Sequence, residues 1–357
     1  RGSVREENQL LQIPLKGPVS ADPWFAFEHI DETAYPYEIE PSPSHGAPLI
    51  AHWKPEEKER FLRAAGEERL RRKAERLLVA IEDRGADQAL YEEIMTAFGY
   101  KNNKAPFRRL AQVVSSHRLR EEAEGDPIKA YAILLGVSGL LPDEAETDWD
   151  EETRTFFRTV WDHWWKRRSR WESAILEPDR WNFSSLRPAN HPTRRLMAAA
   201  HLFSDTPSLF QQLTDETAAS TDELLDRVYG WFLDFPTSYW TRRYSLSGKV
   251  QTGPVALVGP SRTASILLNV ILPFIAATNL SPWEKSDLLD QMPVEPMNAT
   301  IKQTAHLLFG PDHPSSLYRT GMNRQGLIQV FHDFILNMEP ENRVEALGRL
   351  YAPFKTN

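Results

Sequence analysis

The chain has 357 residues, of which 41% are hydrophobic and 26% are charged, the ordinary balance of a soluble globular protein. Its formal net charge of −8 excludes a generally basic coat for nucleic acid but leaves room for a local basic face. It contains no cysteine, which excludes disulfides, thiolate metal sites and a cysteine nucleophile and agrees with a cytoplasmic location.

Residues 1–54 are rich in proline and acidic, with eight acidic side chains against four basic ones. A short strand is expected at 10–15, because this apolar run ends at Gly17 and Pro18. No partner strand lies nearby, so we predict that 1–54 is an extended arm or the remnant of a truncated N-terminal domain. The missing N-terminal domain is expected to pack on this arm. The first residue is Arg1 and not methionine, so we expect the chain to be part of a longer protein.

From Pro55 onward the apolar residues follow helical spacing, and a mainly α fold is predicted. The clearest amphipathic pattern is 67–84, with a glycine directly after it as a stop. Further helices are expected at 87–98, after Pro106 and after Asp126, which precedes a first-turn proline as a cap would.

The acidic linker 143–152 is expected to separate a helical subdomain at 55–142 from a larger helical domain at 149–357. The longest helix is predicted at 151–172, where aromatic residues alternate with Lys and Arg. Such a helix could stack bases and neutralise phosphates. The alternative is one buried aromatic face with the cations in water. The spacing that favours this alternative is that of Phe157, Val160, Trp161, Trp164 and Trp165.

The densest run of constrained and charged residues is 186–195, Leu-Arg-Pro-Ala-Asn-His-Pro-Thr-Arg-Arg. Its two prolines make it a fixed corner, and Asn190 or Thr193 is expected to cap the helix that follows. Three arginines flank the corner: Arg187, Arg194 and Arg195. Guanidinium groups and free backbone N–H groups at a helix start can hold an anion. The alternative is that these arginines pair with acidic neighbours and join two helices.

Residues 235–283 contain no acidic side chain, which makes them the best candidate for a positive surface on this acidic protein. A small β-hairpin is expected within them at 238–258. Ser261 and Arg262 then open a helix, where a second anion contact is predicted. The alternative is that Ser261 is an ordinary helix cap.

The most apolar window is 264–280, which could be mistaken for a membrane span. It is too short, because a span needs about 20 mostly apolar residues, and Asn269 and Pro273 interrupt it. We therefore predict a buried helix and no membrane contact. Helices are also expected at 298–308 and 323–338.

Known catalytic motifs are absent from the sequence: it has no glycine-rich phosphate loop, Gly-x-Ser-x-Gly elbow or His-Glu-x-x-His pair. The scattered histidines predict neither a metal site nor a cofactor. Glu295 and Asn298, in a loop bracketed by prolines, form the one acidic and polar pair that suggests catalysis.

Four segments resemble the DUF2851 family, an uncharacterised bacterial family. They are 90–107 with Gly99-Tyr100-Lys101-Asn102-Asn103-Lys104 inside it, the corner at 186–192, the segment 239–244 that begins Tyr239-Trp240, and 259–273. They occur in the family's order and span most of the chain from Gly66 to Met338. The resemblance implies membership of the family, and no established activity comes with it.

Members of that family carry an upstream segment in which an acidic residue and a Glu-x-His triplet lie on strands, similar to a restriction-type nuclease core. This chain lacks that segment, so the resemblance carries a metal-dependent nuclease activity onto no residue here. Many relatives also end in a cysteine-containing segment, which this sequence lacks.

Two functions from different classes are therefore weighed. The first is an interaction or scaffold module with a groove for nucleic acid, another polyanion or a protein partner. Its predicted contact residues are Arg187, Asn190, Arg194, Arg195, Trp240, Arg242, Arg243, Ser261 and Arg262. A structure that scatters these arginines, or pairs each with a carboxylate, would contradict it. The second is the helical accessory part of a metal-dependent nuclease-like enzyme whose catalytic segment lies N-terminal to this chain.

Overall fold

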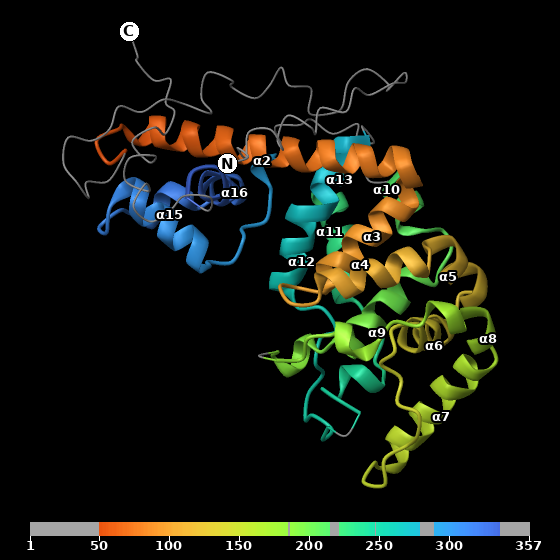
Figure 1. The fold of residues 1–357 in the computed structure, drawn as a ribbon. Coiled ribbons are helices and arrows are strands. Elements are labelled where there is room, and N and C mark those ends of the chain that lie inside the picture. Colours follow the sequence, from red (N-terminus) through yellow and green to blue (C-terminus); the bar gives the residue numbers. More distant parts are fainter. Residues whose placement is uncertain (1–49, 185, 215–220, 247, 279–288, 336–357) are drawn as a thin grey trace, which may run out of the picture.

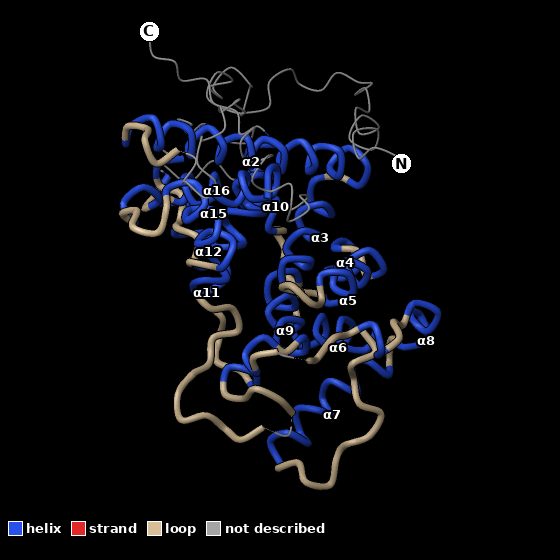
Figure 2. Tube along the Cα trace, turned by 60° about the vertical axis from the view of Figure 1, so that its left-hand side comes forward, coloured by secondary structure: helices blue, strands red, loops and turns tan. Residues whose placement is uncertain are grey.

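The structure is a computed structural model that describes residues 50–184, 186–214, 221–246, 248–278 and 289–335. Helices joined by loops make up this part of the chain, and Figure 2 shows no strand in it. The predicted mainly α fold is confirmed. The strand expected at 10–15 and nearly all of the extended arm lie outside the described residues.

Most helices lie where the apolar spacing predicts them. In chain order they are α2 (Pro55–Arg84), α3 (Ala86–Phe98), α4 (Lys104–Val113), α5 (Ser116–Ala123), α6 (Pro127–Val137), α7 (Glu151–Trp165), α8 (Arg168–Trp171), α9 (Pro192–Phe203), α10 (Leu209–Thr214), α11 (Thr221–Leu233), α12 (Pro260–Ile266), α13 (Leu272–Thr278), α15 (Ala299–Phe309) and α16 (Gly321–Val330). The π-helical turn η6 (Leu267–Ile271) joins α12 to α13. Asp126 caps α6 as predicted, because its carboxylate accepts from the Ile128 N–H at 2.8 Å.

The helix α2 has 30 residues and is the longest in the described part, so the prediction that 151–172 is the longest was wrong. It begins at Pro55, where no backbone donor is needed, and ends before Gly85, whose φ is 81°. Figure 1 shows α2 along one edge of the molecule, above two groups of helices. Its first half lies over α15 and α16, and its second half packs against α3 and α13.

Two hydrophobic cores lie beneath α2. The larger combines its second half with α3, α6, α9 and the helix formed by α12 and α13, and it includes residues from both sides of the 143–152 linker. The smaller joins the first half of α2 to α15 and α16. The division into domains at 55–142 and 149–357 stays a prediction.

The aromatic segment forms two helices, because α7 ends at Trp165 and α8 begins at Arg168. Phe157, Val160 and Trp164 are buried, which confirms that this stripe faces the core. Trp165 alone of the predicted stripe is mostly exposed, at 62%, with the Arg168 guanidinium 5.6 Å from its ring centroid.

The predicted hairpin at 238–258 is not formed by strands. Its first arm begins with a 3₁₀ turn, Tyr239–Thr241. Two backbone hydrogen bonds join the arms, from the Gln251 N–H to the Arg242 carbonyl at 2.8 Å and from the Val255 N–H to the Thr241 carbonyl at 2.6 Å. No ladder extends between the described residues of the two arms, because the buried guanidinium of Arg194 donates to carbonyl groups of both.

The apolar window predicted to be a buried helix lies in the core. The stretch Pro260–Thr278 is long and apolar enough to cross a membrane by length and composition, yet 72% of its apolar window is buried inside the protein. Pro273 lacks a backbone donor and is the second residue of α13, which follows the π-helical turn η6. Asn269, the other interruption, lies on this turn and donates to the Ser265 carbonyl at 2.7 Å.

His201 on α9 predicts how the stability of the fold depends on pH. Its Nε2 is buried without a hydrogen bond, and its ring lies 5.6 Å from that of Phe235. Burial lowers the pKa of His201, and the nearby Asp205 only partly opposes this. A lowered folded-state pKa leaves stability unchanged above the unfolded-state pKa of about 6.5 and reduces it as the pH falls below that value.

We therefore expect the melting temperature to fall between about pH 7.5 and pH 5.5, and to fall less in a His201→Leu variant, which has no proton to gain. Thermal melts followed by circular dichroism measure this. His306→Leu is the control, since that ring lies at the end of α15. Equal acid sensitivity of wild type and His201→Leu would contradict the prediction.

Candidate anion-binding site

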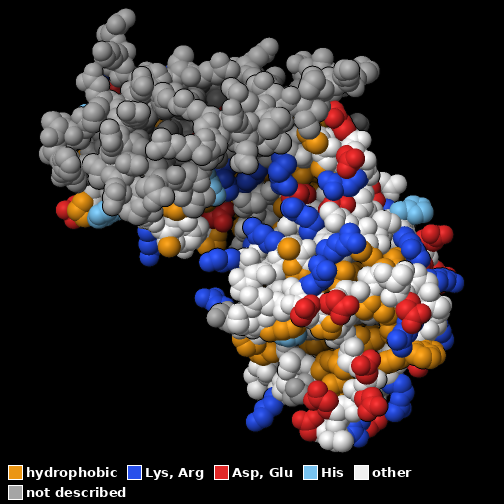
Figure 3. All heavy atoms as spheres, in the orientation of Figure 1, with side chains coloured by type: hydrophobic (Ala, Val, Ile, Leu, Met, Phe, Trp, Pro, Cys, Tyr) orange, Lys and Arg blue, Asp and Glu red, His pale blue; other side chains and the backbone are white. Residues whose placement is uncertain are grey.

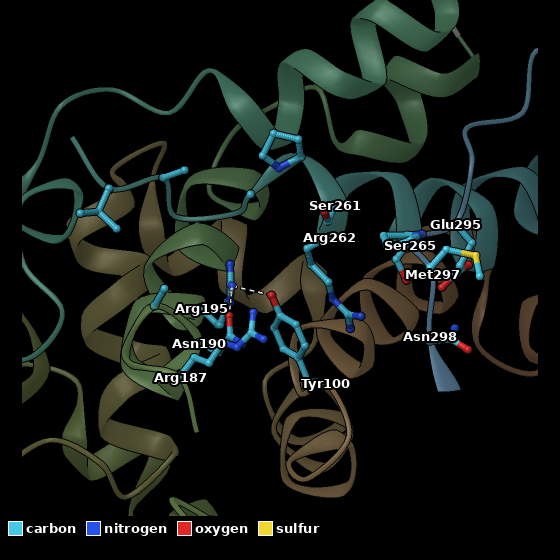
Figure 4. A pocket seen from close by; sticks show the side chains of 16 residues that line it. Tyr100, Arg187, Asn190, Arg195, Ser261, Arg262, Ser265, Glu295, Met297 and Asn298 are labelled. Atoms are coloured by element: carbon cyan, nitrogen blue, oxygen red, sulfur yellow. Dashed lines mark hydrogen bonds between the residues drawn. The ribbon is translucent and has the colours of Figure 1, made fainter. Parts of the chain in front are cut away.

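A cavity of about 550 Å³ opens where four distant parts of the chain meet. The turn after α3, the corner before α9 and the loop that enters α12 form one end, and the loop before α15 forms the other (Figure 4). The lining residues are Tyr100, Arg187, Ala189, Asn190, Arg195, Val255, Ala256, Gly259, Pro260, Ser261, Arg262, Ser265, Glu295, Pro296, Met297 and Asn298.

Tyr100 is presented to the cavity by a strained turn. Its φ is 50°, a left-handed conformation that is rare for a residue with a side chain. Gly99 before it has no room for a side chain, since a Cβ there would lie 2.2 Å from the Asn103 carbonyl oxygen. Asn103 holds the turn through two hydrogen bonds of 2.8 Å with the backbone of Asn182. The turn therefore places the Tyr100 ring between Arg195 and Arg262, as Figure 4 shows.

Arg195 is a buried cation at one end of the cavity, with 2% of its surface exposed. It donates to the Tyr100 hydroxyl at 2.6 Å, to the Asn190 side-chain oxygen at 2.8 Å and to the Leu257 carbonyl. Burial lowers its pKa to about 10, so the guanidinium is still charged at neutral pH. It forms no ion pair with a carboxylate in the described ranges.

Arg262 lies against the other side of Tyr100, with its guanidinium carbon 4.0 Å from the ring centroid. Its Nε is buried and has no hydrogen-bond partner among the described residues. Burial lowers the pKa of Arg262, and the charge of Arg262 in turn helps to lower the pKa of Lys104. Arg187 is exposed at the rim of the same cavity. Several cations therefore meet here with few counter-charges.

Glu295 is the one acidic side chain among the lining residues just described. Its Oε2 accepts from the Gln325 amide at 2.8 Å and from the Asn269 amide at 3.3 Å. Both of these amides bind Lys73 of α2 through their oxygens, at 3.3 Å for Gln325 and 2.5 Å for Asn269. Burial and the neighbouring Arg69 lower the pKa of Lys73 well below its usual range.

Four of the nine predicted contact residues lie away from the cavity. Arg194 and Trp240 are fully buried in the core behind it. Arg243 pairs with Asp150 at 2.6 Å and with Glu152 at 2.7 Å, and Arg242 lies 3.8 Å from Glu152. The alternative that arginines pair with acidic neighbours therefore describes Arg242 and Arg243, whereas Arg194 binds backbone carbonyls. The five predicted residues that the structure brings together are Arg187, Asn190, Arg195, Ser261 and Arg262.

The capping roles expected from the sequence are wrong at both helices of the site. The residue before α9 is His191, with no side-chain cap, and Asn190 instead accepts a hydrogen bond from Arg195. Thr193 lies inside the helix and bonds His191 Nδ1 at 2.7 Å. At α12 the cap position is Gly259, and Ser261 is already helical and exposed. In both cases a proline at the first helical position fixes the start, one or two residues away from the expected cap.

Sequence reasoning missed Tyr100, Lys73 and Gln325 as parts of this site. The sequence indicated Tyr100 only as part of the segment 90–107 that resembles the family, because nothing in a single sequence shows that its turn contacts Arg195. Glu295 and Asn298, which the sequence marked for catalysis, do line the same cavity. Asn298 uses its side-chain oxygen to cap α15, accepting from the Ile301 N–H at 2.9 Å.

Comparison with known proteins places these residues in a family. The model of a protein family of unknown function, DUF2851, matches residues 45–295, which is most of the chain. The chain belongs to the DUF2851 family. The matched range covers every element that lines the cavity as far as Glu295, so the cavity is built mostly from the part that the family shares. No curated protein and no solved structure matches this chain.

Proposed function

We propose that this DUF2851 chain binds a phosphate-bearing polyanion, nucleic acid in particular, in the cavity beside Tyr100. The observation that carries the proposal is that the arginines of this cavity form no ion pair with a carboxylate. Among the described residues, no carboxylate forms an ion pair with Arg187, Arg195 or Arg262, although the charge of Glu295 acts on Arg262. The buried Nε of Arg262 has no acceptor. Planar guanidinium groups that form no ion pair with a carboxylate match the oxygens of a phosphate group.

The surroundings of the cavity support the same ligand. Lys104, at the start of α4, is exposed. Burial lowers its pKa first, and the positive charges of Arg262, Arg108 and Arg69 lower it further. Figure 3 shows Lys and Arg side chains gathered on this face of the molecule below α2, although the whole chain carries a net charge of −8. A local positive face on an acidic protein attracts a polyanion to one place.

Binding is expected to weaken steeply with salt, because each phosphate contact releases counterions from nucleic acid. The measurement is a fluorescence-polarisation titration with single- and double-stranded DNA and RNA at about 50 mM and about 200 mM salt. Arg187→Glu, at the exposed rim, is expected to lower the affinity by about tenfold, or roughly 1.4 kcal/mol. Arg158→Glu, an exposed residue of α7, makes the same change of charge away from the cavity and is expected to bind as the wild type does.

A second variant, Arg262→Gln, removes the buried charge without adding one, and its melting temperature shows whether the fold is retained. A folded Arg262→Gln protein that binds as tightly as wild type would contradict the proposal. Loss of affinity in Arg158→Glu equal to that in Arg187→Glu would also contradict it, because binding would then depend on net charge. Binding to no nucleic acid would favour a protein partner. The alternative, a nuclease-like enzyme, assigns no catalytic residue to this chain, and it stays a prediction.

A further inference from the structure

The cavity has two chemically different ends. Arg195 and Arg262 supply donors and positive charge beside Tyr100, whereas Glu295 supplies acceptors beside Ser265 (Figure 4). The backbone carbonyl of Glu295 accepts from Arg324 on α16, which helps to fix the loop that carries this residue. A ligand that fills the cavity therefore meets donors at one end and a carboxylate at the other.

The orientation of the Glu295 carboxylate is determined by its neighbours. The amide oxygens of Asn269 and Gln325 accept from Lys73, and that of Gln325 also accepts from Arg69 at 2.9 Å. Because their oxygens face these cations, both NH₂ groups must face Glu295, and both donate to its Oε2. Among the described residues, no donor forms a hydrogen bond with its Oε1.

The group that donates to Oε1 is better supplied by a sugar than by a base. Tyr100 is the one aromatic side chain among the residues that line the cavity, and the Arg262 guanidinium already lies 4.0 Å from its ring centroid. The rest of the apolar lining is small or flexible, as with Val255 and Met297. With Arg262 at 4.0 Å and Arg195 at 5.0 Å from its centroid, this ring offers a base little open surface for stacking, whereas a sugar hydroxyl needs only an acceptor.

We propose that the cavity holds a phosphorylated ribose unit, with its phosphate at Arg195 and Arg262 and its 2′-hydroxyl donating to Glu295 Oε1. This inference rests on the proposed function and adds a preference for RNA over DNA, since the 2′-hydroxyl is the group that distinguishes them. Asn269, Gln325 and Lys73 are positioning residues, because they hold the carboxylate and do not contact the ligand.

The test compares single-stranded RNA and DNA of one sequence, bound to wild type and to Glu295→Gln at about 50 mM salt. Wild type is expected to bind RNA about tenfold more tightly than DNA, as one hydrogen bond to a charged group would give. In Glu295→Gln, the amide oxygen must face the Asn269 and Gln325 donors, so its NH₂ group faces the cavity. The cavity then offers a donor where the hydroxyl needs an acceptor. The ratio of RNA affinity to DNA affinity is therefore expected to fall to about one, and this ratio is the readout because the lost negative charge changes both affinities alike.

Glu177→Gln, an exposed residue far along the chain from the loop of Glu295, is the matched control and is expected to keep the preference. Ribose 5-phosphate and 2-deoxyribose 5-phosphate serve as competitors that test the sugar without a base. Equal binding of RNA and DNA by wild type, or an unchanged preference in Glu295→Gln, would overturn the inference. If binding still depended on salt and on Arg187, the proposed function would stand without the preference for RNA. If Arg187→Glu did not weaken binding, both the proposed function and the preference for RNA would be contradicted.

Discussion

An Arg194→Met variant is expected to lose about 4 kcal/mol of unfolding free energy, one of the two largest effects anticipated for a single residue of this chain. Arg194 is completely buried on α9. Its Nη1 donates to the carbonyls of Trp240 and Arg243, and its Nη2 donates to those of Val255 at 3.2 Å and Ala256 at 3.0 Å. One side chain therefore satisfies four carbonyls on both arms of the 238–258 loop.

The expected loss follows from what the substitution leaves behind. Methionine fills a similar volume but has no donor, so the carbonyls stay buried without partners, and each such group costs roughly 1–3 kcal/mol. Burial lowers the pKa of Arg194 to about 10, so the guanidinium is still charged at neutral pH. Arg194→Lys is expected to be nearly as damaging, because one ammonium group cannot reach four carbonyls.

Urea denaturation followed by tryptophan fluorescence measures this effect, with Arg158→Met on the exposed face of α7 as the control. The same variants distinguish a structural arginine from a binding one. Arg194→Met is expected to lower the unfolding free energy directly. It is expected to change nucleic-acid binding only indirectly, through any movement of the 238–258 loop. A variant whose unfolding free energy lies within about 1 kcal/mol of wild type would contradict this account.

The helices could be predicted where local signals agree. α6 has an aspartate cap, a first-turn proline and an apolar run, and α2 has a proline start and a glycine stop. α5 (Ser116–Ala123) was missed because its sequence, Ser-His-Arg-Leu-Arg-Glu-Glu-Ala, buries only Leu119 and Ala123 among its apolar residues. The 238–258 loop was misread because its tyrosine, tryptophan and valine favour strands, whereas Arg194 takes the carbonyls that a ladder would use.

The site could be predicted only in part, for a related reason. The corner at 186–195 and the region without acidic residues drew attention to the correct segments, and three of the six arginines do meet. Which arginine faces the cavity depends on partners far away in sequence, such as Glu152 for Arg243, a separation of 91 residues. Tyr100 reaches Arg195 across 95 residues. Spacing along a chain carries no information about such contacts.

The crossing of α2 and α16 predicts the second of the two large effects, from a much smaller change. Leu62 and Gly66 lie one turn apart on α2, and Met322 and Gly326 lie one turn apart on α16. A Cβ at Gly326 would lie 2.0 Å from the Leu62 carbonyl oxygen, and one at Gly66 would lie 2.4 Å from the Met322 carbonyl oxygen. The two backbones therefore touch at two points where only glycine fits.

Gly326→Ala is expected to destabilise the protein by about 3 kcal/mol, because a backbone carbonyl cannot turn aside as a side chain does. Helix propensity alone predicts the opposite sign, since alanine is favoured over glycine in a helix by roughly 1 kcal/mol. Gly230→Ala on α11 is the matched control: the nearest atom to its Cβ is a flexible Asp234 carboxylate oxygen, 3.2 Å away. Urea denaturation should separate the two variants, and equal stabilisation of both would show that α16 has room to move.

The same substitution links the fold to the candidate site. Gln325, the neighbour of Gly326, accepts from Arg69 and Lys73 of α2 and donates to Glu295. Its position between α2 and the cavity requires the two helices to lie in contact. If α16 shifts outward in Gly326→Ala, the Glu295 carboxylate loses the Gln325 amide, one of the two donors that hold it. The preference for RNA should then weaken more than the salt-dependent binding at Arg187 does. A variant that loses both together would place the phosphate contacts, and not only the sugar contact, under the control of α16.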